Sequence, residues 1–99
     1  MGYCLKYTRR AEKDARLLEQ AGLDKVAKKL LSVLKEDPYQ YPPPYEMLQG
    51  DLKGLCSRRI NKQHRIVYEV FPNDEGLKDD NEELYIGIVK VIRMWTHYE

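Results

Sequence analysis

The sequence predicts an α+β domain with two N-terminal helices packed on one face of a small, mostly antiparallel sheet. Three observations predict it: two helix-periodic segments near the start, a short alternating segment ahead of them, and three strand-like segments after residue 53. The chain has 99 residues, enough for one hydrophobic core, so we expect a single domain over 1–99. The expected order is strand, helix, helix and then three strands.

The first strand and both helices are predicted in the N-terminal third of the chain. Residues 3–7 alternate as in a strand, and Thr8 is a candidate N-cap for a helix over 9–20. Gly22 can adopt the left-handed conformation that ends many helices. A second helix is predicted over 24–36, because its apolar residues fall on one stripe at 3.6-residue spacing.

A proline-rich segment and three strands follow. Residues 39–45 contain three consecutive prolines, which exclude a regular helix or a central strand and indicate an ordered loop. Strands are predicted over 54–61 and 65–71, joined as a hairpin. Residues 72–83 are polar and acidic, and we expect a protruding and mobile loop there. Residues 84–92 are almost continuously apolar, which predicts a central strand, buried on both faces, that pairs with the first strand.

The composition limits the class of protein. A net charge of +1 excludes non-specific binding of nucleic acid through an overall positive charge. A content of 42% hydrophobic and 33% charged residues is typical of a soluble globular domain. No apolar segment approaches the ~20 residues that span a bilayer, and the first residues do not form a secretory signal. Cys4 and Cys56 lack metal-ligand spacing, so we expect free thiols in a cytoplasmic protein without metal or cofactor.

The clearest functional signal is a concentration of basic residues on strand-like segments. From residue 53 to residue 65 the chain has no acidic residue and five cations: Lys53, Arg58, Arg59, Lys62 and Arg65. Guanidinium groups bind phosphate oxygens in a fork geometry. Arg58 and Arg59 must point to opposite faces of one strand, so we expect at least one of them to be structural. Lys53, Arg59 and Arg65 are predicted to bind phosphate on the face without helices.

Two further residues have side chains suited to acid–base chemistry. Glu46 follows the proline-rich loop beside the cations, and His97 follows the strand predicted to be central. His64, in the hairpin turn, is interpreted as structural or solvated. Together, Glu46, Arg65 and His97 can cleave RNA through attack of the ribose 2′-OH on the adjacent phosphate. The products would be a 2′,3′-cyclic phosphate and a 5′-hydroxyl, and composition alone does not favour this cleavage over binding.

These residues resemble those of the YoeB/Txe-like toxins of bacterial type II toxin–antitoxin systems, in the RelE/ParE superfamily. The resemblance rests on Glu46 ahead of Leu48, on Leu52-x-Gly54-x-x-Ser57-Arg58-Arg59-Ile60, on His64-Arg65-Ile66-Val67-Tyr68 and on the terminal His97-Tyr98. It implies a βααβββ RelE-like, metal-independent endoribonuclease that cuts mRNA in the ribosomal A site. By the family pattern Glu46 is the general base and His97 the general acid. Arg65 stabilises the phosphate, with Arg59 and Tyr98 placing the substrate.

The resemblance also implies partners. They are a cognate antitoxin of the YefM/Phd type, whose disordered tail wraps the toxin, the ribosome with its mRNA, and a second toxin copy in a homodimer. The chain departs from the family pattern at several positions. Gln49 stands where a lysine is common, which removes one cation, and Cys56 stands where an aromatic residue is common. The acidic loop 72–83 is longer than usual, and is either an antitoxin contact or a tolerated insertion.

Other functions remain open at this point. A catalytically inactive toxin of the RelE/ParE fold, or a module that binds only antitoxin or operator DNA, would have the same pattern of helices and strands. The gyrase-inhibiting ParE branch lacks the set Glu46, Arg65 and His97, so that set favours the mRNA interferase. A standalone ribonuclease is disfavoured, because the basic cluster is too small to hold free RNA without the ribosome.

Overall fold

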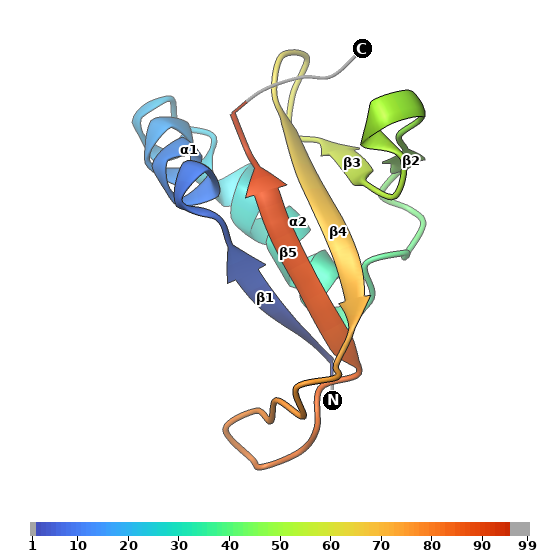
Figure 1. Ribbon diagram of the computed structural model, residues 1–99. Coiled ribbons are helices and arrows are strands. Elements are labelled where there is room, and N and C mark those ends of the chain that lie inside the picture. Colours follow the sequence, from blue (N-terminus) through green and yellow to red (C-terminus); the bar gives the residue numbers. More distant parts are fainter. Residues whose placement is uncertain (1, 96–99) are drawn as a thin grey trace.

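The computed structural model describes residues 2–95, and its architecture is the predicted α+β arrangement (Figure 1). The five-stranded sheet has the order β1-β5-β4-β3-β2. Its strands are β1 (Tyr3–Tyr7), β2 (Glu46–Met47), β3 (Cys56–Arg59), β4 (Arg65–Pro72) and β5 (Gly87–Arg93). The helices are α1 (Arg9–Gln20), α2 (Asp24–Glu36) and the short 3₁₀ helix η1 (Gly50–Leu52). β1 pairs with β5 in parallel, and the other neighbouring strands are antiparallel.

The predicted bounds of β1, α1 and α2 are confirmed, because local signals determine where each begins and ends. Thr8 Oγ1 accepts a hydrogen bond from the Ala11 N–H at 3.0 Å and so caps α1. The same hydroxyl donates to the Ile92 carbonyl at 2.8 Å, which joins the start of α1 to the end of β5. Gly22 has a φ of +75° after α1, and Asp37 is extended before Pro38 after α2.

The other strands differ from the predictions in their bounds. β3 ends at Arg59 and is shorter than the predicted 54–61. β2, which sequence analysis did not predict, is a two-residue strand that exists through its pairing with β3. None of the helices within residues 2–95 is long and apolar enough to cross a membrane.

β5 is the central partner of β1, as predicted, but its predicted burial on both faces is wrong in part. Leu84 and Ile86 are exposed and precede the strand, which begins at Gly87. Within β5, Val89 and Val91 are fully buried, whereas Lys90 is exposed on the face that no helix covers. The apolar run therefore marked the strand correctly but included residues of the preceding connection.

The connection between β4 and β5 protrudes from the end of the sheet, as predicted (Figure 1). It is internally hydrogen-bonded around Asn73, whose side-chain amide donates to the carbonyls of Leu77 and Tyr85 at 3.0 Å each. Glu75 of this loop forms an ion pair with Lys6 of β1, with 3.4 Å between Oε1 and Nζ. The acidic loop is thus an ordered appendage at one end of the sheet.

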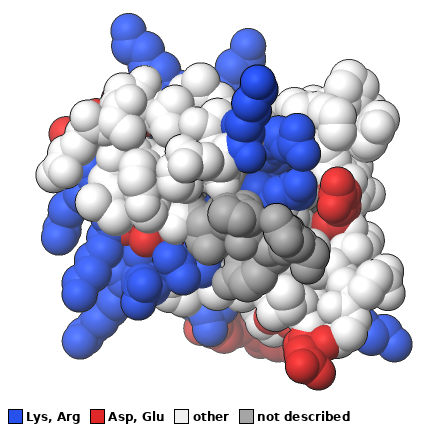
Figure 2. All heavy atoms as spheres, turned by 90° about the horizontal axis from the view of Figure 1, so that it is seen from above, with Lys and Arg blue, Asp and Glu red and all other residues white. Residues whose placement is uncertain are grey.

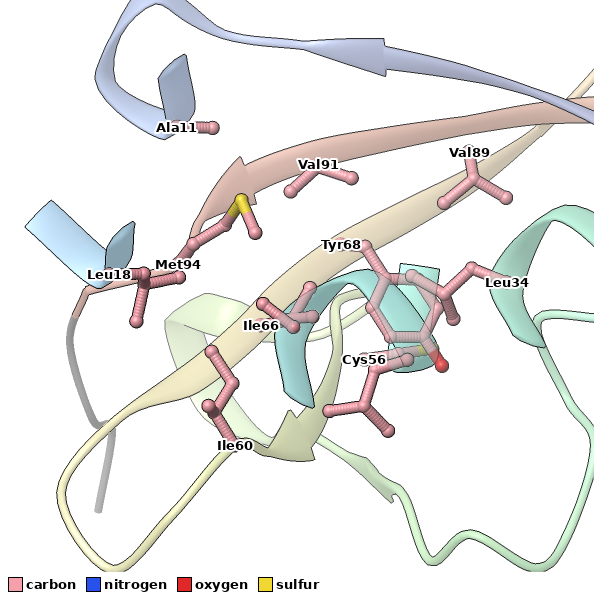
Figure 3. Close-up of a cluster of buried hydrophobic side chains, with 12 residues drawn as sticks. Ala11, Leu18, Leu34, Cys56, Ile60, Ile66, Tyr68, Val89, Val91 and Met94 are labelled. Atoms are coloured by element: carbon pink, nitrogen blue, oxygen red, sulfur yellow. The ribbon is translucent and has the colours of Figure 1, made fainter. Parts of the chain in front are cut away.

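The hydrophobic core lies between the helices and one face of the sheet. Burial removes the apolar surface of these side chains from water, and complete burial of one large apolar side chain stabilises the fold by roughly 1.5–3 kcal/mol. Figure 3 labels Ala11, Leu18, Leu34, Cys56, Ile60, Ile66, Tyr68, Val89, Val91 and Met94. Cys4 and Cys56 are free, as expected, and burial raises the pKa of the Cys56 thiol.

Asp14 of α1 forms hydrogen bonds with residues at and just after the end of β5. Its side chain is 2% exposed, and Oδ2 accepts hydrogen bonds from Arg93 Nε at 2.8 Å and from the Met94 N–H at 2.9 Å. A carboxylate is tolerated at this depth because a guanidinium and a backbone donor satisfy it. The pair holds the last part of the described chain against the first helix.

Replacement of Asp14 by alanine is expected to lower the free energy of unfolding by about 2–4 kcal/mol, because Arg93 and the Met94 N–H lose their acceptor. Urea denaturation followed by circular dichroism measures the change. Glu19→Ala, at an exposed position of the same helix, should alter stability by less than about 0.5 kcal/mol. Equal effects of the two variants would contradict the role of Asp14.

Candidate functional site

A pocket of about 580 Å³ lies where β2, β3 and the β3–β4 turn meet. It contains three of the predicted site residues, Glu46, Arg59 and Arg65. The full lining is Pro43, Pro44, Tyr45, Glu46, Ser57, Arg59, Ile60, Asn61, Lys62 and Arg65. Figure 2 views the molecule from this end and shows a group of Lys and Arg side chains with an acidic side chain nearby.

The strand register brings the polar side chains of the pocket together. Ser57 and Arg59 are two residues apart on β3 and therefore share one face of the sheet. Glu46 of β2 pairs with Ser57, and Arg65 of β4 pairs with Arg59. Directly paired residues point to the same face, so all four side chains lie on the face that carries no helix.

Arg65 is the fixed charge of this group. Its Nη1 donates to Ser57 Oγ at 3.2 Å and lies 3.6 Å from Glu46 Oε2. The Arg65 side chain is 15% exposed, whereas that of Glu46 is 66% exposed. At 3.6 Å, Arg65 and Glu46 form an ion pair, but the two atoms are too far apart for a good hydrogen bond. The site therefore combines a held guanidinium with a carboxylate that a ligand can reach.

The remaining predicted cations differ in their relation to the pocket. Arg59 and Lys62 line it, and both are exposed. Lys53 is exposed immediately after η1 and is not among the lining residues. Gln49 precedes η1, is exposed, and does not line the pocket either.

Arg58 has a structural function on the opposite face of β3. It is 1% exposed, and its guanidinium donates to two backbone carbonyls of the proline-rich segment, those of Gln40 and Pro43, and to that of Pro38 just before it. Its Nε donates to the Tyr68 hydroxyl at 3.1 Å. The expectation that one of the two consecutive arginines is structural is confirmed for Arg58.

Two tyrosines complete the surroundings of this guanidinium. Tyr68 donates its hydroxyl proton to the Pro38 carbonyl at 2.7 Å, and burial raises its pKa far above the ordinary value. The ring of Tyr45 lies against the guanidinium carbon of Arg58 at 4.9 Å, a cation–π contact. Arg58 thus holds the segment that leads directly into Glu46.

Sequence analysis did not identify Ser57 or Tyr45 as parts of the site. The signal for Ser57 was present, because it lies two residues before Arg59 on a predicted strand and must share its face. No sequence pattern pointed to Tyr45, since its position follows from the contacts of Arg58 with the preceding segment.

His97 and Tyr98 lie outside the described residues. The last described residue, Trp95, stacks on His64 with ring centroids 3.8 Å apart and an interplanar angle of 19°. The backbone N–H of His64 donates to Asn61 Oδ1 at 2.7 Å, whereas its ring Nδ1 is buried with no hydrogen-bond partner among residues 2–95. The interpretation of His64 as structural or solvated stays a prediction. Through Asn61, the β3–β4 turn borders the pocket. Within residues 2–95 no group of three or more His, Cys, Asp or Glu could hold a metal ion.

Sequence comparison identifies a family over most of the chain. Residues 6–98 match the YoeB-like toxin of bacterial type II toxin–antitoxin systems. A curated relative, Toxin YoeB from Streptomyces coelicolor, is 41% identical over 49 residues, which cover 50% of this chain and 56% of that protein. The chain spans between about half and two thirds of the length of the curated relatives that it matches.

Solved structures with the same fold include two toxins of this kind. A YoeB/ParE toxin from Agrobacterium tumefaciens is similar with a TM-score of 0.76 and 26% identity, covering 96% of this chain and 99% of that one. A YoeB–YefM complex from Staphylococcus aureus is similar with a TM-score of 0.68 and 25% identity. That match covers 99% of this chain and 100% of the other.

Replacement of Arg58 by methionine is expected to lower the free energy of unfolding by about 2–4 kcal/mol, because the carbonyls of the proline-rich segment lose their donor. Arg59→Met is the matched control, since it removes the neighbouring exposed guanidinium, and should change stability by less than about 0.5 kcal/mol. Urea denaturation of both variants measures the difference. Similar losses in the two would refute the division of roles between these arginines.

Proposed function

The chain belongs to the YoeB-like toxin family of bacterial type II toxin–antitoxin systems, and from this premise we propose that it is a ribosome-dependent endoribonuclease that cleaves mRNA in the A site. One observation carries the proposal: the Arg65 guanidinium lies between Ser57 Oγ and the exposed Glu46 carboxylate in a basic pocket. A fixed cation beside a reachable carboxylate is suited to phosphodiester cleavage by an internal hydroxyl, because the carboxylate can accept the hydroxyl proton and the cation can stabilise charge on the phosphate.

Glu46 starts the proposed reaction as the general base. It removes the proton from a ribose 2′-OH, and the 2′-oxygen attacks the adjacent phosphorus while the bond from phosphorus to the 5′-oxygen breaks. Negative charge builds on the phosphoryl oxygens, where the Arg65 guanidinium stabilises it more strongly than in the starting state. A carboxylate that is 66% exposed leaves room for the sugar to approach.

His97 completes the proposed reaction as the general acid. It protonates the departing 5′-oxygen, so that the products are a 2′,3′-cyclic phosphate and a 5′-hydroxyl. This role is supported by the family match, which includes residue 97, and by the suitability of an imidazole for proton transfer near neutral pH. The scheme uses only side chains of this chain, without a metal or cofactor, and DNA cannot follow it because it has no 2′-OH.

Three further residues are proposed to place the substrate. Arg59 lines the pocket beside Arg65 and can bind a second phosphate oxygen. Lys53, which is exposed outside the pocket, is proposed to contact the RNA backbone beyond the cleaved bond. Tyr98 is assigned to substrate placement by the family resemblance.

The proposed partners follow from the same reasoning. We propose a cognate antitoxin of the YefM/Phd type, since a chain of the YoeB–YefM complex from Staphylococcus aureus has the same fold as this chain over nearly its whole length. The proposed substrate is mRNA on the ribosome, and on the same basis we propose a cytoplasmic location. A toxin homodimer is proposed on the family resemblance.

Glu46→Gln is expected to reduce cleavage of a defined message by about 10²–10⁴-fold, because the amide keeps the shape of the side chain but cannot accept the 2′-OH proton. In vitro translation with purified toxin, followed by primer extension, measures the cuts. End-group analysis should find a 5′-hydroxyl with the wild type. His97→Ala should show a loss of the same order.

Glu36→Gln is the matched control, because Glu36 is an exposed glutamate at the end of α2, and it should cleave as the wild type does. Each variant is tested with and without ribosomes. Full cleavage by folded Glu46→Gln would exclude Glu46 as the base. If folded wild type cleaves nothing under either condition, the chain is a binding protein built on a toxin fold.

A further inference from the structure

Three tyrosines gather on the proline-rich segment at the edge of the pocket. Tyr45 is one of the residues that line the pocket, and its ring packs against the Arg58 guanidinium. The centroid of that ring lies 6.2 Å from that of Tyr39 and 6.2 Å from that of Tyr41. Tyr39 is 46% exposed and Tyr41 69% exposed. An exposed aromatic group that continues into a charged pocket is a surface suited to binding rather than to packing within the chain.

The segment that carries these rings is held in place from within the protein. The Arg58 guanidinium binds the carbonyls of Pro38, Gln40 and Pro43, which lie on either side of the first two tyrosines. The Tyr39 N–H donates to Asp37 Oδ1 at 2.9 Å, which fixes the start of the segment. Folding therefore orders the rings in advance, and a ligand does not have to order them on binding.

We propose that the exposed ring of Tyr41, supported by Tyr45 and Tyr39, forms a stacking surface for a base of the message beside the cleaved phosphate. This inference rests on the proposed function, because it takes the ligand of the pocket to be RNA. Bases of single-stranded RNA commonly stack on aromatic side chains next to cationic grooves. The contact is to the face of the base, so it positions the strand with little dependence on sequence.

The combination of charges and rings favours RNA over a protein segment as the occupant. Arg59, Lys62 and Arg65 provide positive charge in the pocket, and Tyr45 joins that pocket to the exposed ring of Tyr41. An apolar peptide would leave the cations unpaired, and an acidic one would leave the rings uncovered. A nucleotide carries a phosphate and a flat base in one repeating unit, and so it satisfies both features at once.

The test uses the Glu46→Gln variant as its parent and an adenosine trinucleotide whose first and central sugars are 2′-deoxy, so that neither phosphodiester can be cleaved. Titration followed by NMR of the tyrosine ring signals gives the dissociation constant and reports stacking directly. Adding Tyr41→Ala should weaken binding by about fivefold or more, as loss of one stacked base predicts. Tyr41→Phe keeps the ring and should bind within about twofold of the parent, whereas Tyr41→Leu should resemble alanine.

A second arm identifies the base as the group that is bound. With abasic sugars in the oligonucleotide, Tyr41→Ala and its parent should bind equally, because no base remains to stack. Urea denaturation should give the same stability for parent and variant, since the side chain is mostly exposed.

The proposal is overturned if Tyr41→Ala binds the intact trinucleotide as its parent does, or if the parent does not bind it at millimolar concentration. It is also overturned if the ring signals respond only to a co-purified antitoxin, which would make the surface a protein contact. Failure of the proposed function has a different result: wild type does not cleave messages on ribosomes, while RNA affinity still depends on Tyr41.

Discussion

The buried guanidinium of Arg58 is the interaction on which the rest of the site depends. The three consecutive prolines of the preceding segment have no N–H groups, so this part of the chain cannot satisfy its own carbonyls through regular structure. Arg58 provides donors from the sheet to two of the segment's carbonyls, to the Pro38 carbonyl just before it and to the Tyr68 hydroxyl. These bonds, with the ring of Tyr45, offset the cost of removing a charge from water.

The alternation of a strand divides two adjacent arginines between two layers of the molecule. Arg58 faces the core and holds the segment that ends in Glu46, while Arg59 faces the pocket with Ser57. A change of register by one residue would exchange these functions and place a solvated cation in the core. β3 is therefore both the support of the proline-rich segment and one wall of the site, although it has only four residues.

The amino-acid sequence predicted most accurately the structural features that local interactions determine. The ends of the first strand and both helices follow from Thr8, Gly22 and the apolar spacing, and each is confirmed. β2 could not be predicted, because two residues carry no periodicity and the strand exists only through pairing with β3. The residue types of the pocket pointed to Glu46, Arg59 and Arg65, and the alternation of the strand put Arg58 on the other face. Only the tertiary contacts of the proline-rich segment show what holds Arg58 there.

Ser57 and Glu46 act on Arg65 in different ways, and that difference suits the proposed reaction. The ion pair with Glu46 is long, and its carboxylate is solvated, so exchanging it for a phosphate oxygen costs little. The hydrogen bond from Arg65 to the buried Ser57 hydroxyl does not depend on that exchange, and it can keep the guanidinium oriented when phosphate replaces Glu46.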